Sequence, residues 1–149
     1  MGAPVVALAG QIPSFAIDHG HGHLHEIHDQ IGLLRHIVKN SERIRAPQEA
    51  SARVAEATAV AVSGRMGPVA LERVIDVWGQ AAEVALVPPV TVSAPCADPV
   101  AISSAADLLV KAERPLIVLG GRALGAGPEV QAVAEMLRAP VSWFRRGRG

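Results

Sequence analysis

The sequence predicts an α/β protein made of parallel-sheet part-domains, that is, incomplete doubly wound sheets joined by a proline-rich linker. Short, uninterrupted apolar runs such as PVVALAG at residues 4–10 are typical of buried parallel strands. Stretches with helical spacing separate these runs, so strands and helices alternate along the chain. Half of the 149 residues are hydrophobic but only 3% are aromatic, which favours tightly packed layers of Ala, Val, Leu and Ile.

The first half of the chain alternates in this way. Gly10 ends the first apolar run, and the glycines that follow predict a loop up to about residue 23. Residues 25–39 have roughly helical apolar spacing, interrupted by Gly32. A clearer helix is expected from Pro47 to Val62, because Pro lies in its first turn and Ser-Gly follows it.

The second half begins with a linker and continues with a βαβ unit. Residues 78–98 are rich in proline and show little periodicity, which indicates an extended linker. Asp98 and Pro99 then form a good helix start, with Ile102 and Leu108 or Leu109 on the inner face. Another helix is expected at 127–139. The parallel strands are expected near 4–9, 68–72, 115–119 and 140–144.

Composition limits the function classes. The 14 basic and 14 acidic residues cancel, so the chain has no overall field to hold nucleic acid or an anionic membrane. The apolar runs are shorter than the roughly 20 residues that span a bilayer, and the N-terminus lacks the basic region of a signal peptide. A single cysteine, Cys96, excludes an internal disulfide and suits a reducing cytoplasm.

Five of the six histidines lie in one short stretch, HGHGHLHEIH, at residues 19–28. In an extended segment His19, His21 and His23 would face one side, where they could bind zinc or nickel. The stretch is not a zincin motif, because His25 and His28 are three residues apart rather than four. A metal-binding module and a solvated loop with incidental histidines both remain open, and no residue is assigned to a metal ion.

A glycine-rich turn at residues 120–129 lies between an expected strand and helix. Such a turn can bind phosphate through backbone N–H groups, or it can simply allow close helix packing. Glu26 and Asp29 could serve in acid–base chemistry, although solvated carboxylates are more common. The functional and the structural interpretation therefore both stay open for the turn and for the two carboxylates.

Four motifs, in order and over nearly the whole chain, resemble thiamine-diphosphate-dependent enzymes of the acetolactate synthase type. ALAGQIP is similar to a strand and turn with Gly-Gln-Val-Pro, and LHEIHDQIGLLRHIVK to Phe-Gln-Glu, an apolar stretch and Thr-Lys. SGRMGPVALERVIDV resembles Gly-Arg-Pro-Gly-Pro-Val followed by Pro-x-Asp-Val. The stretch from AADLLVKAERPLIVLGG to RALGAG resembles the opening of the family's central domain.

The resemblance implies a domain organisation. Residues 1–88 would be the second half of the pyrimidine-binding domain, 89–98 the linker, and 99–149 the first half of a Rossmann-like central domain. It also implies roles for individual residues, which we list as expectations: Gly10 and Gln11 beside the cofactor, His25 and Glu26 beside the substrate channel as catalytic candidates, Lys39 in that channel, and Gly120 and Gly121 at the FAD of flavin-bearing members.

The implied parent is a cytoplasmic carboligase or decarboxylase that uses thiamine diphosphate and Mg²⁺, with FAD left open. It would act on a small 2-oxo acid, as a homodimer or homotetramer, without nucleic acid or membrane partners. The family's catalytic glutamate and its Gly-Asp-Gly metal motif have no counterpart in the 149 residues. The expectation is therefore a truncated piece that is inactive alone, with a non-catalytic remnant or a histidine-loop metal-binding module as the alternatives.

Overall fold

A computed structural model describes residues 2–144 and 147 of the chain. They form two compact units, one up to Pro95 and the other from Cys96 onward. No helix among the described residues is both long and apolar enough to cross a membrane.

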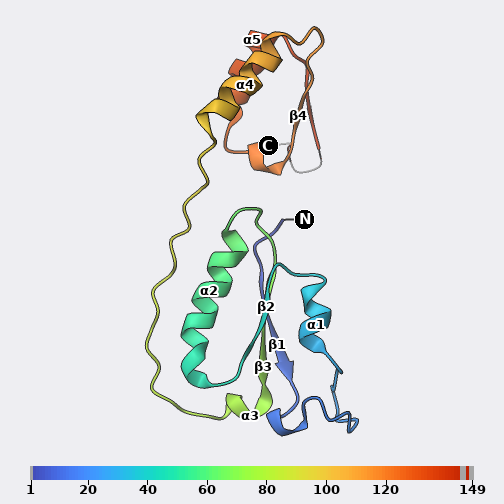
Figure 1. Ribbon diagram of the computed structural model, residues 1–149, viewed down its shortest axis with the longest axis vertical. Coiled ribbons are helices and arrows are strands. Elements are labelled where there is room, and N and C mark those ends of the chain that lie inside the picture. Colours follow the sequence, from blue (N-terminus) through green and yellow to red (C-terminus); the bar gives the residue numbers. More distant parts are fainter. Residues whose placement is uncertain (1, 145–146, 148–149) are drawn as a thin grey trace. The chain divides into compact units, whose positions relative to one another are not determined.

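The first unit is a three-stranded parallel sheet with the strand order β1-β3-β2 (Figure 1). The chain runs from one edge strand across the sheet to the other edge, and only then into the central strand. The elements are β1 (Val6–Gln11), η1 (Ser14–Ala16), α1 (Gln30–Arg35), β2 (Ser41–Ile44), η2 (Pro47–Glu49), α2 (Ala50–Val62), β3 (Val69–Val74) and α3 (Ile75–Trp78).

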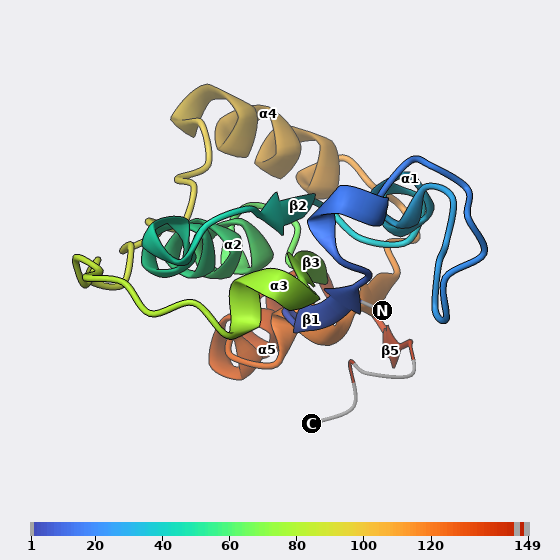
Figure 2. The same cartoon turned by 90° about the horizontal axis from the view of Figure 1, so that it is seen from below.

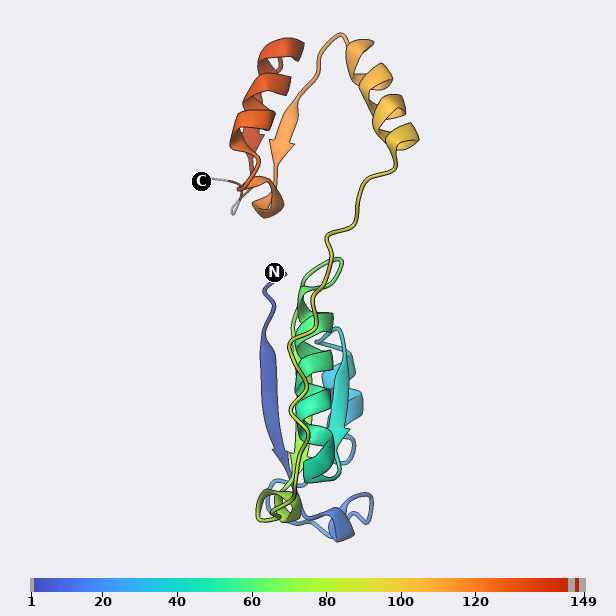
Figure 3. The same cartoon turned by 90° about the vertical axis from the view of Figure 1, so that its left-hand side faces the viewer.

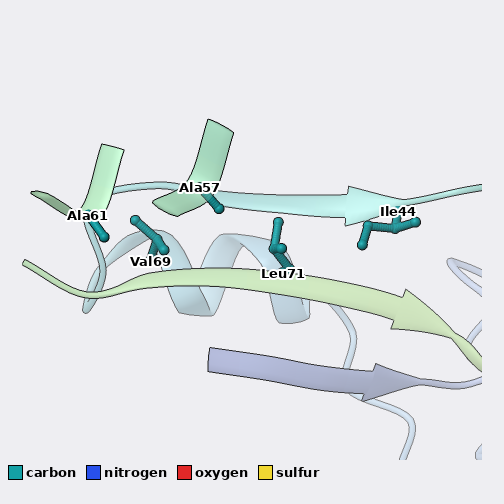
Figure 4. Close-up of a cluster of buried hydrophobic side chains, with 5 residues drawn as sticks. All are labelled: Ile44, Ala57, Ala61, Val69 and Leu71. Carbon is teal, nitrogen blue, oxygen red and sulfur yellow. The ribbon is translucent and has the colours of Figure 1, made fainter. Parts of the chain in front are cut away.

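Helices α2 and α1 lie on opposite faces of this sheet, as the views along and beside the strands show (Figures 2 and 3). The hydrophobic core lies under α2, where Ala57 and Ala61 pack against Val69, Leu71 and Ile44 (Figure 4). Because alanine is small, the helix can approach the sheet closely. The low aromatic content is thus matched by a thin core of small aliphatic side chains.

The α1 face of the sheet carries a buried polar row beside the buried apolar side chains of Ala70 and Val74. Glu72 on the central strand is 0% exposed, and its carboxylate accepts hydrogen bonds from Arg43 Nε on β2 and from Gln11 Nε2 on β1, the latter at 3.3 Å. Side chains alternate along a strand, so Glu72 faces away from the Val69–Leu71 core. A buried charge is tolerated when it is paired and hydrogen-bonded, and this row links all three strands.

Lys39, just before β2, fastens the end of α2. Its ammonium group donates hydrogen bonds to the carbonyl oxygens of Val60 and Ser63, the latter at 2.9 Å. Those carbonyls lack helical partners and carry the negative end of the helix dipole, so a cation there is favourable. A methyl group on Gly67 would come within 2.9 Å of the Lys39 side chain, so glycine leaves room for it.

The second unit contains one short parallel pair, β4 (Ile117–Leu119) with β5 (Val141–Trp143). The connection between them consists of η3 (Gly121–Ala123) and α5 (Gly127–Leu137), as the expected βαβ unit requires. Helix α4 (Pro99–Val110) precedes β4, and the carboxylate of Asp98 accepts a hydrogen bond from Val100 N–H at 3.1 Å. The predicted Asp98 cap and Pro99 start are therefore confirmed.

The α/β class and all four expected parallel strands are confirmed. The expected helix over 25–39 is wrong in extent, since only Gln30–Arg35 is helical. Asp29 explains the late start: its side chain accepts a hydrogen bond from Gly32 N–H at 2.8 Å and so caps the helix. Strand β2 was not expected. The proposed inner face of α4 is also wrong within the described residues, because Ile102, Leu108 and Leu109 are exposed.

Residues 80–98 contain no helix or strand, and Val87 N–H donates a hydrogen bond to Ser51 Oγ on α2 at 2.7 Å. That the segment is an interdomain linker stays a prediction.

Replacing Arg43 with methionine would leave the Glu72 carboxylate buried without its cation. Removing one partner of a buried ion pair costs about 3–5 kcal/mol, and about 1.4 kcal/mol corresponds to a tenfold change. We expect amide protection in β3 to fall by roughly 100-fold or more in hydrogen exchange. The double variant Arg43→Met with Glu72→Leu should recover most of that protection, and equal losses in both variants would contradict the assigned role.

Candidate functional site

A pocket of about 650 Å³ lies at the carboxyl end of β1, where ligands bind in open parallel sheets. One wall is the turn that follows β1, another is the loop that precedes α1, and a third is the helix that follows β3. The lining residues are Gly10, Gln11, Ile12, Pro13, His23, Leu24, His25, Glu26, Ile27, Gln30, Ile75 and Trp78. Four residues singled out from the sequence, Gly10, Gln11, His25 and Glu26, thus meet in one pocket.

The turn after β1 is held by two glutamine side chains. Gln11 Oε1 accepts a hydrogen bond from Ile12 N–H at 2.8 Å, while Gln11 Nε2 donates to Glu72. Gln30, the first residue of α1, donates from Nε2 to the carbonyl of Gly10 at 2.9 Å. The amide of Gln11 is engaged at both its nitrogen and its oxygen, and its side chain forms part of the pocket wall.

The loop before α1 closes on itself through Glu26. His23 N–H donates a hydrogen bond to Glu26 Oε2 at 2.8 Å. That backbone hydrogen bond is the largest influence on the pKa of Glu26 and lowers it; desolvation opposes it, and the N–H groups of Gly22 and Gly20 assist it. Glu26 is therefore ionised at neutral pH. His25 beside it is exposed and has a left-handed backbone, with φ of 69°.

The opposite wall is apolar and rigidly mounted. Trp78 is 58% exposed, and the guanidinium carbon of Arg73 lies 3.9 Å from its ring centroid. Such a cation–π contact is attractive and favours this position of the ring. Asp76 accepts hydrogen bonds from the backbone N–H of Ser14 at 2.9 Å and from its hydroxyl at 2.6 Å. These bonds lower the pKa of Asp76, the hydroxyl more than the N–H, and they tie α3 to the turn after β1.

The histidines of the HGHGH segment lie side by side but do not form a metal centre. Ring centroids are 5.5 Å apart for His19 and His21, and 6.2 Å apart for His21 and His23, which are stacked. The segment is a loop, as the glycines predicted, and not the extended strand in which the three histidines would face one side: Gly20 and Gly22 have φ of 66° and 73°, values that glycine adopts readily. Within residues 2–144 and 147, no group of three or more His, Cys, Asp or Glu side chains is arranged to hold a metal ion.

The remaining expected site residues lie apart from this pocket. Lys39 lies just before β2, its ammonium group binds carbonyls at the end of α2, and it is not among the residues that line the pocket. Gly120 and Gly121 follow β4 in the second unit, where Gly120 precedes η3. A smaller hollow of about 360 Å³ lies between β4 and α5, and its lining includes Leu119 but neither glycine.

Gln30, Ile75 and Trp78 line the pocket but were not identified from the sequence. The sequence gives little indication that these residues line a site, because an isolated glutamine or an apolar residue after a strand usually has a structural role. The strand order would have revealed them: it brings the segment after β3 next to the turn after β1, since β1 and β3 are adjacent.

The Glu26 turn gives a prediction about pH. Because the pKa of Glu26 is lowered in the folded state, its stabilisation of the loop is present above the unfolded pKa and lost as pH falls through the folded pKa. We expect the NMR shift of the His23 amide proton to titrate with a midpoint below the ordinary glutamate value of about 4.3. Glu26→Gln should abolish that titration; a midpoint above the ordinary value would contradict the assignment.

Comparison with known proteins gives relatives that match almost the entire chain. A "Probable acetolactate synthase large subunit" from Methanocaldococcus jannaschii is 33% identical over 156 residues, which cover 99% of this chain and 26% of the relative. An acetolactate synthase from Arthrospira platensis is 34% identical, covering 98% and 26%. A "Probable 2-ketoarginine decarboxylase" from Pseudomonas aeruginosa is 32% identical, also covering 98% and 26%. No family profile matches the chain.

The chain thus spans about a quarter of the length of these curated relatives. The similarity extends through all four motifs and through both units, and the parallel strands fall where the motifs placed them. The chain belongs to the acetolactate synthase-like family of thiamine-diphosphate-dependent enzymes.

Proposed function

We propose that this chain is part of a thiamine-diphosphate-dependent enzyme that cleaves or forms a carbon–carbon bond next to the carbonyl of a 2-oxo acid. In this proposal the pocket at the end of β1 lies against the cofactor. The observation that carries it is the meeting of Gly10, Gln11, His25 and Glu26 around one hollow of about 650 Å³. That size and the mixture of apolar walls with a few polar groups suit a small-molecule site.

The residues fit the cofactor's chemistry. The rings of thiamine are flat and one is cationic, and the pocket offers the apolar side chains of Ile75, Leu24 and Trp78 together with the ionised Glu26 carboxylate. When bound, the cofactor supplies the electron sink for the bond change. The chain itself would provide an apolar wall that excludes water, a carboxylate at the channel rim and an exposed imidazole at His25 for hydrogen bonding.

The finer assignments belong to the same proposal. Residues 1–88 would be the second half of the pyrimidine-binding domain and 99–149 the first half of the central domain, joined by the linker at 89–98. Mg²⁺ would be held by a different part of the complete enzyme, and FAD, where present, by Gly120 and Gly121. Lys39 would act on the channel indirectly, by fastening α2. The complete enzyme would be a cytoplasmic homodimer or homotetramer.

Thiamine should bind the pocket, and Trp78 should report it. We expect a saturable change of tryptophan fluorescence when thiamine is added to the Trp143→Phe variant, in which Trp78 is the remaining tryptophan. Glu26→Gln should weaken binding several-fold because it removes the charge opposite the cation.

Glu83→Gln is the matched control, since Glu83 is exposed and does not line the pocket. Binding that is equally weakened in both variants, or in neither, would argue against the proposed site.

The 149-residue chain alone should consume no pyruvate with thiamine diphosphate and Mg²⁺. The family's catalytic glutamate and Gly-Asp-Gly motif have no counterpart in it, so whole catalytic roles are missing. A coupled assay for pyruvate disappearance provides the measurement, with an active acetolactate synthase as positive control. Turnover above the protein-free rate would refute this division of roles.

A further inference from the structure

A second, strongly polar hollow lies along the edge strand β2 of the first unit, with residues of both α1 and α2 in its lining, and it shares no lining residue with the pocket at the end of β1. It consists of two cavities of about 250 and 400 Å³ that have Asp18, Arg43 and Arg45 in common. The larger cavity also has Arg35 and Arg53 in its wall. Four arginines thus surround one hollow, and we call it the arginine cleft.

Arg43 is held in place at the floor of this cleft. Its Nε donates to the fully buried Glu72 carboxylate, and its side chain is 21% exposed. Among the described residues its two terminal nitrogens have no hydrogen-bond or ion-pair partner. A guanidinium held from below in this way keeps its outer N–H groups ready for an oxyanion without further loss of side-chain freedom.

Arg35 and Arg45 supply charge that has no partner. Arg35 is the last residue of α1 and Arg45 follows β2, so they approach the cleft from different elements. Neither guanidinium has a hydrogen-bond or ion-pair partner within residues 2–144 and 147. Arg53, in contrast, is paired with Glu42 at 2.7 Å and with Glu56 at 3.4 Å.

The carboxylates of the cleft are mostly occupied. Asp29 caps α1 through Gly32, and Glu42 accepts hydrogen bonds from Arg53 and from Asn40, the latter at 3.0 Å. Asp18 is the exception, since its carboxylate has no partner among the described residues. The unpartnered groups are therefore two guanidinium cations, the free half of a third, and one carboxylate.

We propose that the arginine cleft binds the phosphate group of a small phosphorylated molecule. Guanidinium groups that approach from three positions can each meet a different oxygen of a phosphate, whereas a planar carboxylate offers two oxygens that one arginine can occupy. The larger cavity has the volume of a small-molecule site. This site goes beyond the proposed catalytic role, and neither depends on the other.

Titration of the full 149-residue chain with pyrophosphate, without divalent cations, tests the proposal. Calorimetry should show saturable binding with one site, and NMR should place the shift changes at Arg43, Arg45 and Arg35. Arg45→Gln and Arg35→Gln should each weaken binding about tenfold, as expected for the loss of one charge-assisted pair. Asp18→Asn should strengthen binding by removing the opposing charge, and asparagine tolerates the φ of 66° at that position.

Arg65→Gln is the matched control, because Arg65 is also exposed but lies between α2 and β3, at the amino ends of the strands. The Arg65→Gln variant should bind pyrophosphate as tightly as the unaltered chain does. The proposal is overturned if pyrophosphate binding is not saturable, or if Arg65→Gln weakens it as much as Arg45→Gln does. It is also overturned if acetate displaces pyrophosphate as well as inorganic phosphate does, or if the NMR shift changes appear at His23–Ile27 and Trp78 instead of at the arginines.

Discussion

The buried carboxylate of Glu72 is the constraint on which the first unit depends. It lies at the centre of the sheet with no exposed surface, so it requires partners, and it takes one from each neighbouring strand. Arg43 fixes the position of β2, and Gln11 fixes the end of β1. A sheet with only a thin core of small aliphatic side chains on its other face thereby gains a polar connection that is specific for strand order and register.

The same polar row separates two hollows with opposite character. On the β1 side, hydrogen bonds at both ends of its amide hold Gln11 in the pocket wall, next to Gly10, Ile12 and apolar groups from α3. On the β2 side, Arg43 has its outer nitrogens turned to a cleft lined with further arginines. One buried acid therefore shapes an apolar pocket suited to flat rings and a cationic cleft suited to an anion.

Patterns within short segments of the sequence were enough to predict four of the strands and the start of one helix. Apolar runs identified β1, β3, β4 and β5, and Asp98 with Pro99 identified the start of α4. Strand β2 was not predicted because its sequence, Ser-Glu-Arg-Ile, is typical of an exposed segment. Ser41 is buried and donates a hydrogen bond to the Ile31 carbonyl, and the partly exposed Arg43 pairs with Glu72. Such partners lie on other elements, so a pattern within the segment cannot show them.

For the pocket, resemblance identified Gly10, Gln11, His25 and Glu26, which meet there, but the geometry adds Gln30, Ile75 and Trp78. These three depend on the path of the chain, which passes from β1 over the sheet to β2 before it returns in β3 beside β1. The crossover places Gln30 against Gly10 and the segment after β3 against the turn after β1. The spacing of residues along the sequence does not show which strands are neighbours, whereas the pairing of β3 with β1 and β2 does.

The relatives of this chain are named for different reactions. Proteins named for a synthase reaction and for the decarboxylation of 2-ketoarginine or oxalyl-CoA match the same stretch at 32–34% identity. The acetolactate synthases match 98–99% of this chain and the oxalyl-CoA decarboxylase matches 80% of it, so relatives with different names share most of this stretch. Under the proposed function, the shared architecture would supply a common wall for the cofactor, and individual side chains at the pocket rim would distinguish substrates. The proposal would include His25 among them: the resemblance aligns it with the glutamine of the family motif, and it is exposed and lines the pocket with Glu26.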